Sequence, residues 1–163
     1  MNTRKMTYLS LSVIVMTALL AAVHANDRGA GAQALVGSWK VRITPVAPPQ
    51  PQFDELMTFS PGGGIVESNN YPFFQLGLGT PGPGQGSWSY EGNQEFAFTF
   101  IKLLYASGGQ AAGTLKVIGT INYASENDTW SSPATVSICD NQAENCAVIG
   151  TTQGQATRIV AGQ

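Results

Sequence analysis

The sequence predicts an all-β fold, a single eight-stranded antiparallel up-and-down β-barrel. After residue 30, no stretch of the chain keeps a helical repeat of apolar residues for three turns. The chain instead contains short runs of alternating apolar and polar residues, separated by Gly, Pro, Asn and Asp. Because no helices cover the apolar faces of these strands, closing the sheet on itself would bury them and remove its edges. An open two-sheet β-sandwich is the alternative.

Residues 1–25 are predicted to be a secretory signal peptide. Arg4 and Lys5 give a positive start, residues 9–23 form an apolar stretch, and residues 23–25 match a small-x-small cleavage site. We therefore expect export to the periplasm or the extracellular space. No contact with the membrane is expected once the signal is removed.

The composition that remains excludes several function classes. The only histidine, His24, leaves with the signal, which excludes Ser-His-Asp and Cys-His catalysis and histidine metal sites. We expect no metal and no cofactor. Six basic and ten acidic side chains remain, a formal net charge of −4, which argues against a nucleic-acid partner. Residues 26–34 are rich in Gly and Ala and are expected to be flexible, and residues 35–163 form the barrel domain.

Eight strands are predicted from the alternation and the turn residues. Two Pro-rich or Gly-rich segments separate some of them: residues 45–52 are expected to be extended, and residues 75–86 to form a mobile loop at the barrel mouth. The latter contains a G-x-G-x-x-G pattern, but Pro81 and Pro83 prevent the helix that a dinucleotide site needs. The strands are expected near residues 36–44, 53–60, 64–69, 86–91, 95–105, 113–124, 129–138 and 147–160.

The first predicted hairpin turns at residues 60–64 and carries acidic residues on an apolar face. Its register pairs Phe59 with Ile65, Met57 with Glu67, and Glu55 with Asn69. Glu55 and Glu67 therefore interrupt an otherwise apolar face, and we interpret both as lying at a rim or on the solvent side.

Two further hairpins separate an apolar face from a polar one. A turn at residues 92–94, with Gly or Asn at positive φ, and a turn at residues 125–128 fix their registers. The expected pairs are Tyr90 with Phe96 and Trp88 with Phe98 in one, and Tyr123 with Trp130, Gly119 with Ala134, Val117 with Val136 and Leu115 with Ile138 in the other.

These two hairpins share a row of aromatic side chains that is either packed core or the wall of an apolar ligand cavity. Gly119 and Ala134 remove volume from the middle of this face and favour a cavity. Lys102 continues the face, and its ammonium is expected to reach the rim; the alternative is a counter-ion for a ligand carboxylate or for Glu67. The candidate pocket residues are Trp88, Tyr90, Phe96, Phe98, Phe100, Tyr123 and Trp130.

Cys139 and Cys146 are predicted to form a disulfide. An even pair at short range in an exported chain is most simply a structural bridge. The alternative, a redox or metal pair, is disfavoured because six intervening residues do not make a C-x-x-C motif and no other soft ligand is available.

The two ends of the domain resemble the lipocalin and wider calycin pattern. Gly37-Ser38-Trp39 opens the first strand, and Arg158 lies in the last. In that pattern a Gly-x-Trp tryptophan closes one barrel end and an arginine from a late strand packs on it. The compact form is similar to the small barrels around allene oxide cyclase, although the Thr-Asp-Tyr motif of true lipocalins is missing. The resemblance implies a barrel with a pocket for a small apolar molecule.

Three functions are consistent with the sequence. The first is an exported barrel that binds a small apolar ligand in its lumen without catalysis. The second is a cofactor-free isomerase or cyclase, with Glu67 as general acid or base. The third is a surface or interaction protein with a solid core.

Overall fold

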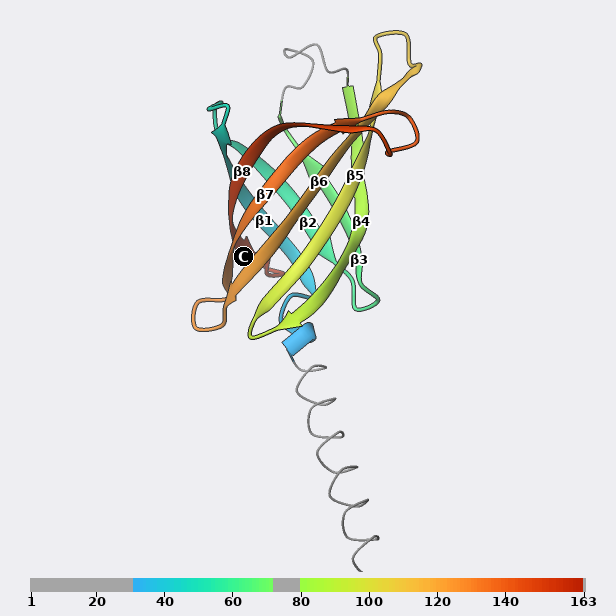
Figure 1. Cartoon of the computed structure of the whole chain (residues 1–163). Coiled ribbons are helices and arrows are strands. Elements are labelled where there is room, and N and C mark those ends of the chain that lie inside the picture. The colour runs from blue at the N-terminus through green and yellow to red at the C-terminus, as the bar shows by residue number, and fades with distance from the viewer. Residues whose placement is uncertain (1–30, 72–79, 163) are drawn as a thin grey trace, which may run out of the picture.

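The eight strands close into one antiparallel barrel. The structure is a computed structural model that describes residues 31–71 and 80–162. Each strand pairs with the next, and the first pairs with the last (Figure 1), so the predicted barrel is confirmed and the sandwich is excluded. The strands are β1 (Gly37–Ala47), β2 (Phe53–Phe59), β3 (Gly64–Asn69), β4 (Thr80–Gly92), β5 (Glu95–Tyr105), β6 (Ala111–Ala124), β7 (Thr129–Cys139) and β8 (Cys146–Arg158).

The registers of all three predicted hairpins are confirmed. Phe59 pairs with Ile65, Trp88 with Phe98, and Tyr123 with Trp130, and the other expected pairs follow in step. A slip of one residue would exchange the buried and exposed faces, so the segregation of apolar side chains specifies the register.

The prediction of a loop over residues 75–86 is wrong in part. Residues 75–79 lie outside the described residues, but residues 80–86 belong to β4. Proline is compatible with extended backbone, and the register is irregular between Pro81 and Gly84, where ladder hydrogen bonds are interrupted. Gly86 is required by packing, because a Cβ there would lie 1.9 Å from the carbonyl oxygen of Thr99.

One end of the barrel is closed by Trp39 and the chain that precedes it. Trp39 is fully buried, and its indole Nε1 donates a hydrogen bond to the carbonyl oxygen of Leu35 at 2.9 Å. The guanidinium carbon of Arg158 lies 4.1 Å from the centroid of the Trp39 ring, as the sequence predicts. Arg158 also donates hydrogen bonds to the carbonyl oxygens of Ala34 and Val36, so β8 fastens the segment that crosses this end.

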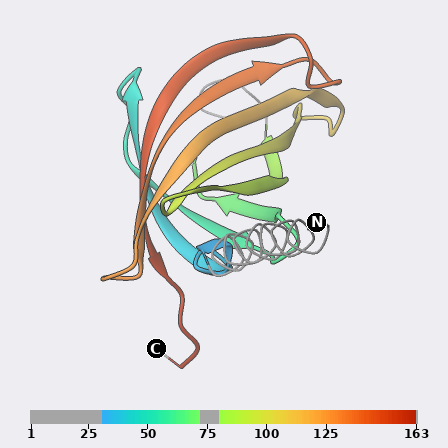
Figure 2. The same ribbon diagram turned by 60° about the horizontal axis from the view of Figure 1, so that its bottom comes forward.

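The described part of the N-terminal segment is ordered against this end. Residues 31–33 are helical, as Figure 2 shows where the bottom of the barrel comes forward, and Leu35 is fully buried. The predicted signal peptide at residues 1–25 lies outside the described residues. Among the residues from 31 to 162 that the structure describes, no helix has the length and apolarity needed to cross a membrane.

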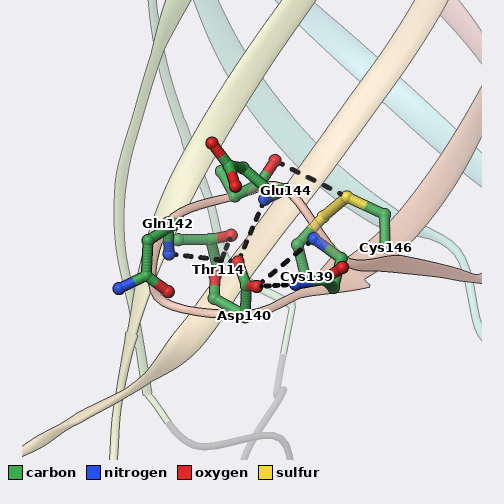
Figure 3. Close-up of a disulfide and its surroundings, with 8 residues drawn as sticks. Thr114, Cys139, Asp140, Gln142, Glu144 and Cys146 are labelled. Atoms are coloured by element: carbon green, nitrogen blue, oxygen red, sulfur yellow. Dashed lines mark hydrogen bonds between the residues drawn. A yellow bond between two sulfur atoms is a disulfide. The ribbon is translucent and has the colours of Figure 1, made fainter.

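At the opposite, open end, the predicted disulfide joins β7 to β8. Cys139 and Cys146 are paired partners in the ladder, with their Cα atoms 4.0 Å apart. The Asp140 carboxylate accepts hydrogen bonds from the backbone N–H groups of Gln142, Glu144 and Asn145, which orders the turn that the disulfide closes (Figure 3). Both features fix this corner of the barrel mouth.

Reduction of the Cys139–Cys146 disulfide is expected to lower the melting temperature without abolishing folding. The chain between the cysteines is short, so the lost constraint on the unfolded state is worth roughly 2–3 kcal/mol, a fall in Tm of about 5–15 °C. Scanning calorimetry with and without a reductant measures this. An unchanged Tm after complete reduction, or two free thiols in the exported protein, would contradict it.

Candidate functional site

A cavity of about 260 Å³ occupies the open half of the barrel lumen. It lies away from Trp39, between the end of β1, the start of β2 and the start of β8. Its lining is mostly apolar, with contributions from every strand except β4. Among the lining residues are Ile43, Phe53, Met57, Phe98, Phe100, Leu115, Val117, Trp130, Ala134, Val136, Ile149 and Gly154.

The aromatic row of the two central hairpins is divided between core and cavity wall. Phe98, Phe100 and Trp130 line the cavity. The other four candidate pocket residues do not. Trp88 and Tyr90 each pack against Phe96, with ring centroids 5.8 Å and 5.1 Å from it, and Tyr123 packs edge to face with Trp39 at the closed end.

The two small residues of that row have different roles. Ala134 lines the cavity, as the sequence predicts. Gly119 does not, because a Cβ at this position would lie 2.7 Å from the Phe98 ring. Gly119 therefore makes room for an aromatic ring and does not leave space for a ligand.

The interpretation of Glu67 and Lys102 as rim residues is wrong, whereas the alternative, Lys102 as a counter-ion for Glu67, is confirmed, because the two form a buried ion pair. Glu67 is fully buried and Lys102 is 2% exposed. The Glu67 Oε1 atom accepts hydrogen bonds from the Lys102 ammonium and the Asn69 amide, both at 2.9 Å, and Oε2 lies 2.8 Å from the same ammonium nitrogen. Burial raises the pKa of Glu67, and Lys102 and Asn69 oppose that rise. Neither partner lines the cavity.

A glycine makes this pair possible. Glu67 and Lys102 flank Gly84 in one cross-strand row over β3, β4 and β5. A Cβ on Gly84 would lie 2.5 Å from Glu67 Oε2 and 2.9 Å from the Phe100 ring. The two charged side chains therefore meet over a residue that has no side chain.

Glu55 is the functional candidate that sequence reasoning missed. It was expected at a rim or in solvent, but it is 5% exposed and lines the cavity. Burial raises the pKa of Glu55 well above its usual range, the charge of Glu67 raises it further, and Lys102 opposes the rise. The signal was present in the predicted register, because Glu55 shares its face with Met57 and Phe59 and closure turns that face inward.

Two more polar side chains on the cavity wall lack hydrogen-bond partners among the described residues. Trp130 and Ser132 lie on the inward face of β7 and are 3% and 4% exposed. In the part of the chain that the structure describes, neither the Trp130 Nε1 nor the Ser132 Oγ has a hydrogen-bond partner. Buried polar atoms are almost always satisfied, so these two indicate a partner from outside the described residues.

Comparison with known proteins adds no assignment to this geometry. No protein-family model matches the chain, and a search of curated proteins gives no match. Within residues 31–71 and 80–162, no three His, Cys, Asp or Glu side chains come together in a way that could hold a metal ion.

Proposed function

We propose that this protein is an exported barrel that binds a small, largely apolar molecule in the open half of its lumen. The observation that carries the proposal is the 260 Å³ cavity inside a closed barrel, with an apolar lining and few polar groups. Such a combination is typical of small-molecule sites, which usually measure roughly 300–1,000 Å³. The ligand is therefore smaller than a drug-sized molecule.

The barrel's construction supports a lipocalin-like role. An eight-stranded barrel is just wide enough to be filled by side chains or to hold one small ligand. Here the Trp39–Arg158 contact and the aromatic cluster fill one end and leave the other open. The disulfide favours an oxidising compartment, in agreement with the predicted signal peptide.

The two alternatives have less support. An isomerase or cyclase that uses Glu67 would need this carboxyl group at the cavity, whereas it is engaged by Lys102 and Asn69 behind the wall. A solid-core interaction protein would not need an apolar cavity with unpartnered polar groups on its wall.

Filling the cavity is expected to abolish binding. Ala134→Leu adds three carbons to the cavity wall, whereas Thr135→Leu, its neighbour on β7, adds a comparable side chain on the opposite, outward face. In a fluorescence titration with 1-aminoanthracene, an uncharged apolar probe, we expect wild type and Thr135→Leu to bind one equivalent. Ala134→Leu should bind at least tenfold more weakly.

The outcome that would contradict the proposal is equally direct. If 1-aminoanthracene does not bind to the wild type, or binds equally to Ala134→Leu, the lumen is not the site. Native mass spectrometry of protein isolated from its own host provides an independent check, because a natural ligand should appear as a constant added mass.

A further inference from the structure

Among the polar side chains that line the mostly apolar cavity, those of Glu55, Trp130 and Ser132 together indicate the chemistry of the ligand. Glu55 extends from β2, and Trp130 and Ser132 extend from β7. The indole Nε1 and the hydroxyl have no hydrogen-bond partner among the described residues. The hydrogen bonds that Lys102 Nζ and Asn69 Nδ2 donate beside Glu55 go to Glu67 Oε1 and not to Glu55. Within the described part of the chain, the Trp130 indole nitrogen and the Ser132 hydroxyl are thus left without a hydrogen-bond partner.

The barrel register relates these groups to one another. Glu55 pairs with Val41, Val41 with Ala156, and Ala156 with Trp130, so Glu55 and Trp130 belong to one cross-strand row. Ser132 lies two residues from Trp130 and faces the same way. The three residues thus line one cavity from two strands, β2 and β7.

The charges around Glu55 select its uncharged form. The titratable groups that face it are Glu67 from β3 and Lys102 from β5, and Tyr71 lines the same cavity. One ammonium cannot neutralise two buried carboxylates, and Lys102 is already engaged by Glu67. Burial and the Glu67 charge both favour protonated Glu55.

Protonation decides what Glu55 offers to a ligand. A protonated carboxyl group can donate a hydrogen bond, the indole N–H can only donate, and the hydroxyl can do either. All three groups can therefore donate a hydrogen bond to an acceptor atom of a ligand. An ammonium head would leave the Trp130 N–H unmet, and a carboxylate head would add a negative charge near Glu55 and Glu67.

We infer that the lumen takes an uncharged molecule with an apolar body and one oxygen head, a carbonyl or a hydroxyl, which Glu55, Trp130 and Ser132 bind by hydrogen bonds. This inference rests on the proposed function and narrows it to a ligand class. Glu55 is then a binding residue that favours ligands whose head group is uncharged and carries a hydrogen-bond acceptor.

A series of ligands with one apolar body and different heads tests this. Nonane, 2-nonanone, 1-nonanol, nonylamine and nonanoate would each compete with 1-aminoanthracene for the wild type at pH 6. We expect the ketone and the alcohol to bind at least tenfold more tightly than nonane. The charged amine and carboxylate should bind more weakly than the ketone and the alcohol.

Variants of Glu55 and Ser132 test whether these side chains cause the preference for an oxygen head group. Glu55→Leu and Ser132→Ala should each reduce the preference for 2-nonanone over nonane, and Glu55→Leu should reduce it at least fivefold. Glu55→Gln keeps an N–H donor and should keep most of the preference. The control Glu95→Gln, an exposed residue of β5, should change nothing. Thermal unfolding confirms that each variant folds.

The pH dependence of ligand affinity shows whether Glu55 acts as a hydrogen-bond donor or only fills space in the cavity wall. Wild-type affinity for 2-nonanone should fall as pH rises through the raised pKa of Glu55, whereas Glu55→Gln should show no such fall. Stability follows the same sign, because a raised carboxyl pKa contributes stability below about pH 4.3, which is lost at higher pH. Glu55→Gln should therefore melt at a higher temperature than wild type at pH 8 but not at pH 4.

Failure of this inference differs from failure of the proposed function. If 1-aminoanthracene binds but nonane competes as well as 2-nonanone, or no compound of the series competes, the oxygen head is refuted and the apolar lumen stands. Tighter binding of nonylamine would show that Glu55 acts as an ionised counter-ion, which also overturns the inference. If neither the probe nor any compound of the series binds, both proposals fail.

Discussion

Replacing Lys102 with methionine is expected to lower the free energy of unfolding by about 3–5 kcal/mol at neutral pH, because it leaves the Glu67 charge buried without its partner. Methionine has nearly the length of lysine and fills the same space, so the loss reports the charge and not a hole in the core. The Glu67 side chain is fully buried, and besides Lys102 its carboxyl group contacts the Asn69 amide and the backbone of Gly84, neither of which carries a charge. Urea unfolding at pH 7 measures the difference.

The sign of the pH dependence distinguishes this explanation from a packing defect. In Lys102→Met, burial still raises the pKa of Glu67, and the ammonium that opposed the rise is gone. The destabilisation should therefore be present at neutral pH and disappear as pH falls toward about 4, where the unfolded carboxyl group is protonated as well. A packing defect would cost the same at both pH values.

A double variant and a surface lysine complete the test. Lys102→Met combined with Glu67→Gln removes both charges and should recover most of the lost stability, since uncharged replacements of buried pairs are often neutral. Lys116→Met alters an outward-facing lysine of β6 and should change stability by less than about 0.5 kcal/mol. Equal losses in Lys102→Met and in the double variant would refute the ion-pair account.

The register of the barrel could be predicted because two independent features agree. Turn length and the separation of apolar from polar faces both specify the pairing of Trp88 with Phe98 and of Tyr123 with Trp130. The closed fold then follows from the strand count and the missing helices. The same register also places Glu55 on the face that closure turns inward. The general cost of burying a charge, however, favours a position at the rim or in solvent.

The Glu67–Lys102 pair could be predicted only as an alternative, because its geometry depends on a segment that the sequence presents as a loop. Gly and Pro dominate residues 80–86, yet this stretch is the strand that lies between β3 and β5. Only with Gly84 in the row do Glu67 and Lys102 become neighbours. The division of the aromatic residues between core and cavity wall also depends on which end of the barrel is filled, a three-dimensional property.

Replacing Arg158 with lysine is expected to lower the free energy of unfolding by about 2–3 kcal/mol, although the charge is kept. The planar guanidinium lies on the Trp39 ring, donates to the carbonyl oxygens of Ala34 and Val36, and pairs through Nε with the Asp128 carboxylate. A lysine has one nitrogen and no plane, so it cannot make these contacts at once. Thermal and urea unfolding measure the loss.

The matched control is Arg42→Lys, which changes an arginine paired with a carboxylate on the outside of the barrel. The Arg42 Nε atom lies 2.7 Å from Asp54 Oδ1, but the arginine side chain is 53% exposed and contributes little. We expect this variant to lose less than about 0.5 kcal/mol. If Arg158→Lys loses no more than Arg42→Lys, Arg158 does not fasten the closed end.

The acid limb of the stability curve gives a second readout of the same contact. Arg158 lowers the pKa of Asp128, so the contribution of their pair is present above the unfolded carboxyl pKa of about 3.9 and is lost as pH falls through the lowered value. The difference in stability between wild type and Arg158→Lys should narrow at low pH. It should not vanish, because the Trp39 contact and the two carbonyl hydrogen bonds do not titrate. If the stability difference between wild type and Arg158→Lys disappears completely in acid, the pair with Asp128 accounts for all of it and the cation–π contact contributes nothing measurable.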